Sequence, residues 1–181
     1  MIDQIMEYNK KFVENKGYEP FLTSKYPDKK LAILTCMDTR LIELLPAALG
    51  IKNGDAKIIK NAGGVIVHPY GSVVRSLLVG ILELGVEEVM VIGHTDCGVQ
   101  GMDGSEMLEK LVERGIDQQH IDIVRHSGID LERWLGGFES VESSVHETVR
   151  RLKEHPLMPK DVRISGFIMD SATGELTRVE A

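Results

Sequence analysis

The chain has 181 residues, of which 43% are hydrophobic and 27% charged, and its formal net charge is -7. This length and composition suit one soluble globular domain, residues 1–181, and exclude a fibrous or disordered chain. Clustered lysine and arginine are what bind a phosphate backbone. The scattered basic residues and the acidic balance therefore argue against nucleic acid as a partner.

The beginning of the chain does not have the pattern of a secretory signal, which is a charged segment followed by an apolar stretch. No apolar run approaches the roughly 18 residues that a membrane helix needs. Because there are only two cysteines and no visible signal, we expect a cytoplasmic protein in a reducing compartment, with no membrane partner.

The predicted elements alternate between helix and strand from the N-terminus onward. Apolar residues at helical spacing predict an amphipathic helix over 2–15, whose apolar face must be covered by the rest of the domain or by a second copy of the chain. A buried strand is predicted over 31–35, a short helix over 41–49, and a second strand over 56–61. A strongly periodic helix follows over 72–84 and ends at Gly85.

The second half of the chain continues this alternation. A third strand is predicted over 88–93, weaker helices over 106–113 and 118–125, and a clearer helix over 139–154. Strands over 163–169 and 175–179 then form a hairpin. We therefore predict an α/β fold with a central, mainly parallel sheet flanked by helices and with a C-terminal antiparallel hairpin strand.

Two polar clusters, each directly after an apolar strand, hold the only two cysteines of the chain. The cluster over 36–40 contains Cys36, Asp38 and Arg40, and the cluster over 94–98 contains His94 and Cys97. Zinc binds thiolate, imidazole and carboxylate, usually four in a tetrahedron, and the carboxyl ends of parallel strands meet at one edge of a sheet. These clusters predict a mononuclear zinc site. That interpretation is favoured over packing cysteines and over a redox pair, which normally has the form Cys-x-x-Cys.

Several residues in and near the two clusters are candidates for catalysis or substrate binding. Asp38 and Arg40 are two positions apart after a strand, so their side chains point to the same side and can form an ion pair beside the metal. Asp38 would then accept a hydrogen bond from water at the metal, with a plain surface ion pair as the alternative. Asp96 suits equally an acceptor near the site and a turn residue. Gly63 and Gly64 are candidates for close approach to substrate, although a glycine pair there also suits a turn.

Three motifs together resemble the β-class carbonic anhydrases, in particular a smaller bacterial branch, over nearly the whole chain. They are Cys-x-Asp-x-Arg after the first strand, Asn-Ala-Gly-Gly after the second and His-x-x-Cys-Gly after the third. The resemblance implies a lyase that interconverts carbon dioxide and bicarbonate with one Zn²⁺ per chain, bound by Cys36, His94 and Cys97. It implies that Asp38 either completes the ligand set or turns away to pair with Arg40. It also implies a homodimer embraced by N-terminal helices, and leaves open whether dimers pair into tetramers.

The chain departs from the better-known members of that family at several positions. Thr39 replaces a serine, Val99 replaces a glycine, and the segment 24–28 lacks the glutamine that orients substrate in many members. Two alternatives stay open: a hydrolase of carbonyl sulfide or carbon disulfide, and a non-catalytic zinc-binding protein whose site is closed by two cysteines, one histidine and one aspartate. Because two thiolates nearly cancel the charge of zinc, we expect carbonic anhydrase activity to favour alkaline pH.

Overall fold

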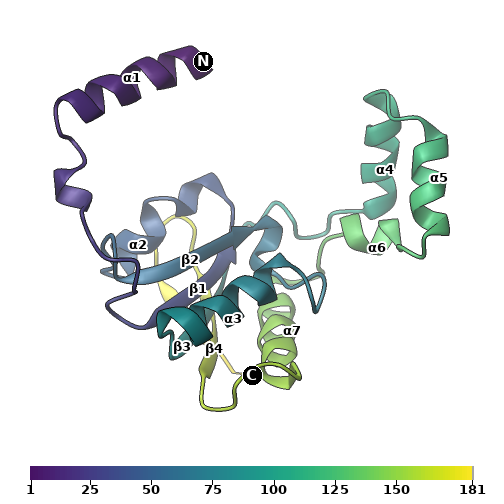
Figure 1. Ribbon diagram of the computed structural model, residues 1–181. Coiled ribbons are helices and arrows are strands. Elements are labelled where there is room, and N and C mark those ends of the chain that lie inside the picture. Colours follow the sequence, from purple (N-terminus) through teal and green to yellow (C-terminus); the bar gives the residue numbers. More distant parts are fainter. Residues whose placement is uncertain (181) are drawn as a thin grey trace.

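A five-stranded sheet in the order β2-β1-β3-β4-β5 forms the centre of the computed structural model, which describes residues 1–180 (Figure 1). Neighbouring strands are parallel except for β5, which is antiparallel to β4. The strands are β1 (Leu31–Cys36), β2 (Ala56–Asn61), β3 (Glu88–His94), β4 (Arg163–Met169) and β5 (Leu176–Val179). The predicted α/β fold with a C-terminal antiparallel strand is confirmed.

Most of the predicted helices lie close to their predicted bounds. Within the predicted helix over 41–49 only Leu44–Ala48 is α-helical, and a 3-10 helix over Thr39–Leu41 precedes it. A further α-helix over 131–135 and 3-10 helices over 19–21 and 62–64 are too short to be recognised from periodicity. The α-helices are α1 (Ile2–Glu14), α2 (Leu44–Ala48), α3 (Ser72–Leu84), α4 (Gly104–Glu113), α5 (Gln118–His126), α6 (Leu131–Leu135) and α7 (Val141–Glu154). The 3-10 helices are η1 (Glu19–Phe21), η2 (Thr39–Leu41) and η3 (Ala62–Gly64).

Both faces of the sheet are buried, which explains why its strands read as continuous apolar runs. On one face, Leu34 of β1 belongs to a core that α3 and α7 complete with Leu77 and Val149. On the other face, Ile33 belongs to a second core that includes Leu45 of α2. Successive residues of β1 thus point to opposite sides of the sheet, as expected for a strand.

The sheet register aligns the carboxyl ends of three strands. Thr35 of β1 pairs with Ile92 of β3 on one side and with Lys60 of β2 on the other. The Thr35 hydroxyl also donates a hydrogen bond of 2.8 Å to the Ile92 carbonyl. The chain segments that follow β1, β2 and β3 therefore emerge side by side at one edge, which brings the three sequence motifs together.

Two parts of the molecule project away from the sheet (Figure 1). Helices α4, α5 and α6 share a small core of their own, formed by Leu108, Ile121 and Leu131. Helix α1 has no buried residue at all. None of the helices within residues 1–180 combines the length and the apolar character that crossing a bilayer requires.

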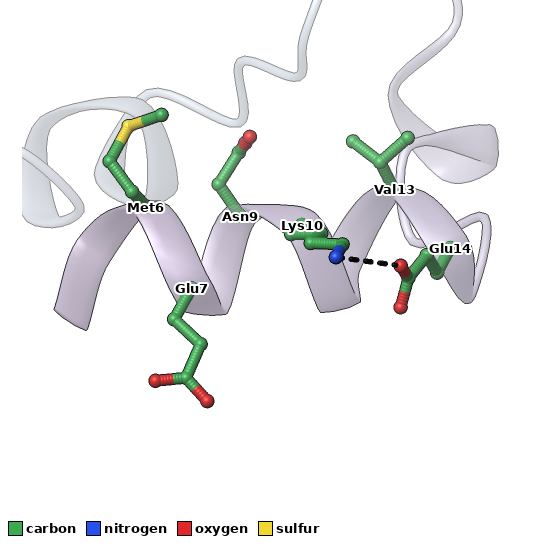
Figure 2. A pocket seen from close by; sticks show the side chains of 6 residues that line it. All are labelled: Met6, Glu7, Asn9, Lys10, Val13 and Glu14. Atoms are coloured by element: carbon green, nitrogen blue, oxygen red, sulfur yellow. Dashed lines mark ion pairs between the residues drawn. The ribbon is translucent and has the colours of Figure 1, made fainter. Parts of the chain in front are cut away.

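The N-terminal helix also carries a shallow surface hollow that none of the motif residues lines. Figure 2 shows Met6, Asn9 and Val13 on one side of α1 and Glu7 on the other, with Lys10 paired to Glu14. The hollow has a volume of about 560 Å³ and is lined only by residues of α1: Met6, Glu7, Asn9, Lys10, Val13 and Glu14. Because all of its lining comes from one exposed helix, this hollow does not enclose a small molecule.

Candidate metal centre

Three side chains that could bind a metal meet at the carboxyl edge of the sheet. Cys36 ends β1, His94 ends β3 and Cys97 lies in the turn after β3. All three are buried, and their ligand atoms lie within 4.8 Å of one another. The two sulfur atoms are 3.9 Å apart. Two sulfurs bound to one tetrahedral zinc, each at about 2.3 Å, would lie roughly 3.8 Å apart, so the spacing suits a shared metal.

His94 is oriented to offer its second ring nitrogen to that metal. Its Nδ1 lies 2.9 Å from the Thr95 carbonyl oxygen, so this nitrogen carries the proton and donates it. Its Nε2 is therefore the nitrogen with a free lone pair. Within residues 1–180 this fully buried atom has no hydrogen-bond partner. A buried polar atom left unpaired costs about 1–3 kcal/mol, and a metal bound by Nε2 would remove that cost.

The two thiols differ in how readily they ionise in the metal-free site. Burial raises the pKa of Cys36, but the His94 imidazole and the backbone of Asp38 and Gly63 outweigh burial and lower it from 9.0 to about 7. Burial raises the pKa of Cys97 above its ordinary value. Because the thiolate is the form that binds a metal, Cys36 is available as a ligand near neutral pH, whereas ionisation of Cys97 would accompany metal binding.

Asp38 lies beside this group and is held by Arg40. Arg40 donates from Nε to Oδ1 at 3.0 Å and from Nη2 to Oδ2 at 2.9 Å. The backbone N–H of Arg40 also donates to Oδ1, so that Asp38 caps helix η2. These contacts hold the pKa of Asp38 well below its usual range. Asp38 Oδ2 is 3.9 Å from His94 Nε2, so the carboxylate is close to the group while paired to Arg40.

Asp96 is the second carboxylate bound to Arg40. Its Oδ2 accepts a hydrogen bond of 2.9 Å from Arg40 Nη1, and its backbone oxygen accepts one of 2.8 Å from Nη2. Its backbone is in the left-handed region, with φ of 54°. The sequence leaves open whether Asp96 is an acceptor near the site or a turn residue, and in the structure it has both properties.

Of the two glycines after β2, Gly64 lies against the backbone of β1 and Gly63 lies against side chains. Gly64 has φ of +66°, and a Cβ there would come within 2.9 Å of the Thr35 carbonyl carbon and 3.0 Å of the Cys36 nitrogen. Gly63 has φ of +82°, and a Cβ would lie 3.0 Å from the Phe138 ring. Glycine is therefore required for close packing at these positions. Their contact with substrate stays a prediction.

Sequence reasoning missed Lys60, which lies near the same edge. Its Nζ is buried and has no hydrogen-bond partner among residues 1–180. Burial lowers its pKa, while the charges of Cys36 and Asp38 act in the opposite direction. The sequence feature that could have pointed to Lys60 is its place directly before Asn-Ala-Gly-Gly. In the sheet Lys60 pairs with Thr35. Gln100 is the glutamine nearest to the cluster over 94–98. Its side-chain amide donates a hydrogen bond of 3.1 Å to the Glu139 carbonyl oxygen, so this amide group already has a partner in the fold.

Comparisons with known proteins agree on one family. Residues 31–176 match the family model described as carbonic anhydrase. The Bacillus subtilis protein YvdA, whose name assigns it provisionally to the carbonic anhydrases, is 52% identical over 175 residues, or 97% of this chain and 89% of the relative. A carbon disulfide hydrolase of Acidithiobacillus thiooxidans is 31% identical over 158 residues, or 82% of this chain and 76% of that protein. The crystal structure of β-carbonic anhydrase isoform I from Trichomonas vaginalis superposes with a TM-score of 0.88 at 34% identity, covering 99% of this chain and 97% of that one.

Proposed function

Because the chain belongs to the β-carbonic anhydrase family, we propose that it catalyses the reversible hydration of carbon dioxide to bicarbonate and a proton. One zinc ion per chain would be held by Cys36, His94 and Cys97. The observation that carries the proposal is the buried group of two sulfurs and one imidazole, with His94 Nε2 lacking any other partner in the described chain. Zinc in such a site supplies a Lewis acid that activates water near neutral pH.

Asp38 is the catalytic carboxylate in this proposal, and Arg40 positions it. The group of Cys36, His94 and Cys97 supplies three ligands, one fewer than a closed structural zinc site. With Asp38 paired to Arg40, the fourth position is left to water and substrate. The low pKa of Asp38 keeps the carboxylate ionised, so it can accept a hydrogen bond from the reacting water and orient it.

A closed, non-catalytic site makes a different prediction for the same residue. If Asp38 served only as a fourth ligand, Asp38→Ala should weaken zinc retention. If Asp38 is catalytic, the variant should keep its zinc and lose activity. Zinc content by mass spectrometry, measured together with stopped-flow hydration of carbon dioxide, separates the two. If zinc-loaded wild-type protein hydrated carbon dioxide no faster than buffer at mildly alkaline pH, the proposed carbonic anhydrase activity would be wrong.

A second candidate function is hydrolysis of carbon disulfide or carbonyl sulfide. The observation in its favour is the similarity to a carbon disulfide hydrolase at 31% identity over 158 residues. The greater similarity to a protein named provisionally as a carbonic anhydrase, at 52%, favours carbon dioxide. Rates on the three linear substrates, measured with one preparation of zinc-loaded protein, decide between them. A higher kcat/KM for carbon disulfide would reverse the assignment.

We also propose that residues 1–181 form one domain that works as a homodimer, with α1 lying on the partner subunit. Helix α1 has no buried residue, and Ile2, Ile5 and Met6 on it are more than half exposed. Such an apolar stripe requires a covering surface. Two free cysteines support a reducing, cytoplasmic location. Light scattering on the intact chain gives the subunit number, including any pairing of dimers into tetramers.

A further inference from the structure

We propose that Asp96 is a positioning residue that holds the guanidinium of Arg40 in the orientation that pairs with Asp38. The inference rests on the proposed function, in which Asp38 must stay off the metal for water to enter. It assigns Asp96 a role that the motif alone does not reveal, because Asp96 lies in the His94–Cys97 turn and Arg40 lies after a different strand.

The guanidinium of Arg40 donates hydrogen bonds to two carboxylates, those of Asp38 and Asp96. Nε and Nη2 of Arg40 donate to Asp38, whereas Nη1 donates to the Asp96 carboxylate at 2.9 Å. Nη2 also donates to the Asp96 backbone oxygen at 2.8 Å. A planar guanidinium is fixed in direction when two of its edges are bound. Asp38 binds the Nε–Nη2 edge and Asp96 binds the neighbouring Nη1–Nη2 edge, so that only Nη1 is held by the Asp96 carboxylate alone.

The backbone of Asp96 supports the same arrangement. Its φ of 54° is in the left-handed region, which few residues other than glycine, asparagine and aspartate adopt readily. Glycine would suit this turn but would supply no carboxylate. Most other residues would strain the turn. Aspartate combines the required backbone with an acceptor of full negative charge, so a turn role alone does not account for the contact with Arg40.

The expected effect is moderate, because the Asp96 side chain is 85% exposed and that of Arg40 is 41% exposed. Ion pairs in such surroundings change an equilibrium by about two- to five-fold and are weakened by salt. Loss of the Asp96 carboxylate should therefore change the ratio of two states of Asp38, paired to Arg40 or bound to the metal, by about two- to five-fold in favour of the metal-bound state. Asp38 would still keep its own contacts with Arg40.

Two variants test this without disturbing the turn. Asp96→Gly keeps the left-handed backbone and removes the side chain, while Asp96→Asn keeps the backbone and one acceptor oxygen but removes the charge. Protein loaded with Co²⁺ is titrated with azide, and the visible spectrum reports occupation of the open metal position. Glu43→Gln is the control, since Glu43 is an exposed acid three positions from Arg40 and has no ion pair with it among residues 1–180.

We expect Asp96→Gly to weaken azide affinity by about two- to five-fold at low salt, with Asp96→Asn in between and the control unchanged. At about 1 M salt the difference between variant and wild type should nearly vanish, because the screening length falls to about 3 Å. Equal azide affinity of Asp96→Gly and wild type at low salt would overturn the proposal, as would a difference that salt does not alter. If Asp96→Gly lost metal, the test would use Asp96→Asn instead, compared with wild type at equal metal content. Equal azide affinity at low salt, or a difference that salt does not alter, would again overturn the proposal. Because azide is the probe, this result does not depend on activity with carbon dioxide.

Discussion

Substitution of Gly64 by alanine should destabilise the fold and disturb the metal centre together. Gly64 has φ of +66°, and an added Cβ would meet the Thr35 carbonyl carbon at 2.9 Å and the Cys36 nitrogen at 3.0 Å. Both atoms are backbone of β1, so they cannot move aside as a flexible side chain can. The strain must be relieved by shifting the end of β1, which carries Cys36.

The magnitude follows from two separate costs. A left-handed backbone costs a residue with a Cβ about 1–2 kcal/mol. Overpacking against a rigid neighbour adds about 1–3 kcal/mol. Gly64→Ala should therefore lower the free energy of unfolding by about 2–5 kcal/mol. Gly50 supplies a matched control, because it has φ of +63° but an added Cβ there would meet nothing within 4 Å. Gly50→Ala should show only the backbone cost.

Urea unfolding of the zinc-loaded proteins, followed by circular dichroism, measures both variants in one assay. The difference between them reports the contact of Gly64 with β1, together with any loss of zinc that follows from that contact, apart from the shared cost of the left-handed backbone. Zinc content should also fall in Gly64→Ala and stay unchanged in Gly50→Ala. Equal loss of stability in the two variants would refute the reasoning, since the close approach to Thr35 and Cys36 would then contribute nothing.

Four further results are expected. Asp38→Ala should lower kcat/KM for carbon dioxide by about 100-fold or more with zinc retained, as is typical for loss of a group that acts on the reacting proton; a loss of zinc in step with activity would instead indicate a structural ligand. Cys36→Ser should reduce zinc to well under one ion per chain by mass spectrometry, and full occupancy would argue against Cys36 as a ligand. In metal-free protein, ultraviolet absorbance should show a first thiolate forming as pH rises through about 7 and a second only at higher pH, since the pKa of Cys36 is lowered and that of Cys97 is raised; Cys36→Ser should abolish the first step. Ile5→Glu should weaken subunit association in light scattering, because Ile5 is 61% exposed on α1, and an unchanged mass at all concentrations would exclude α1 from the interface.

The sequence by itself determined the strands, the longer helices and their order. The apolar run at Leu31–Cys36 and the periodic stretch at Ser72–Leu84 have one favourable arrangement each, a buried strand and an amphipathic helix. Gly85, at φ of 74°, ends that helix as expected. It also determined the convergence of Cys36 and His94, because parallel strands present their carboxyl ends at one edge.

Only the tertiary structure decided how the remaining groups meet at that edge. The contact of Asp96 with Arg40 joins two loops, and the closeness of Gly64 to β1 depends on the register of β1 against β2. Lys60 reads in sequence as an ordinary charged residue of an edge strand, yet its Nζ is buried near Cys36 and Asp38. Periodicity reports which side of an element is buried but not which distant group lies against it. Those contacts depend on register, twist and side-chain direction, which are fixed only when the whole sheet is assembled.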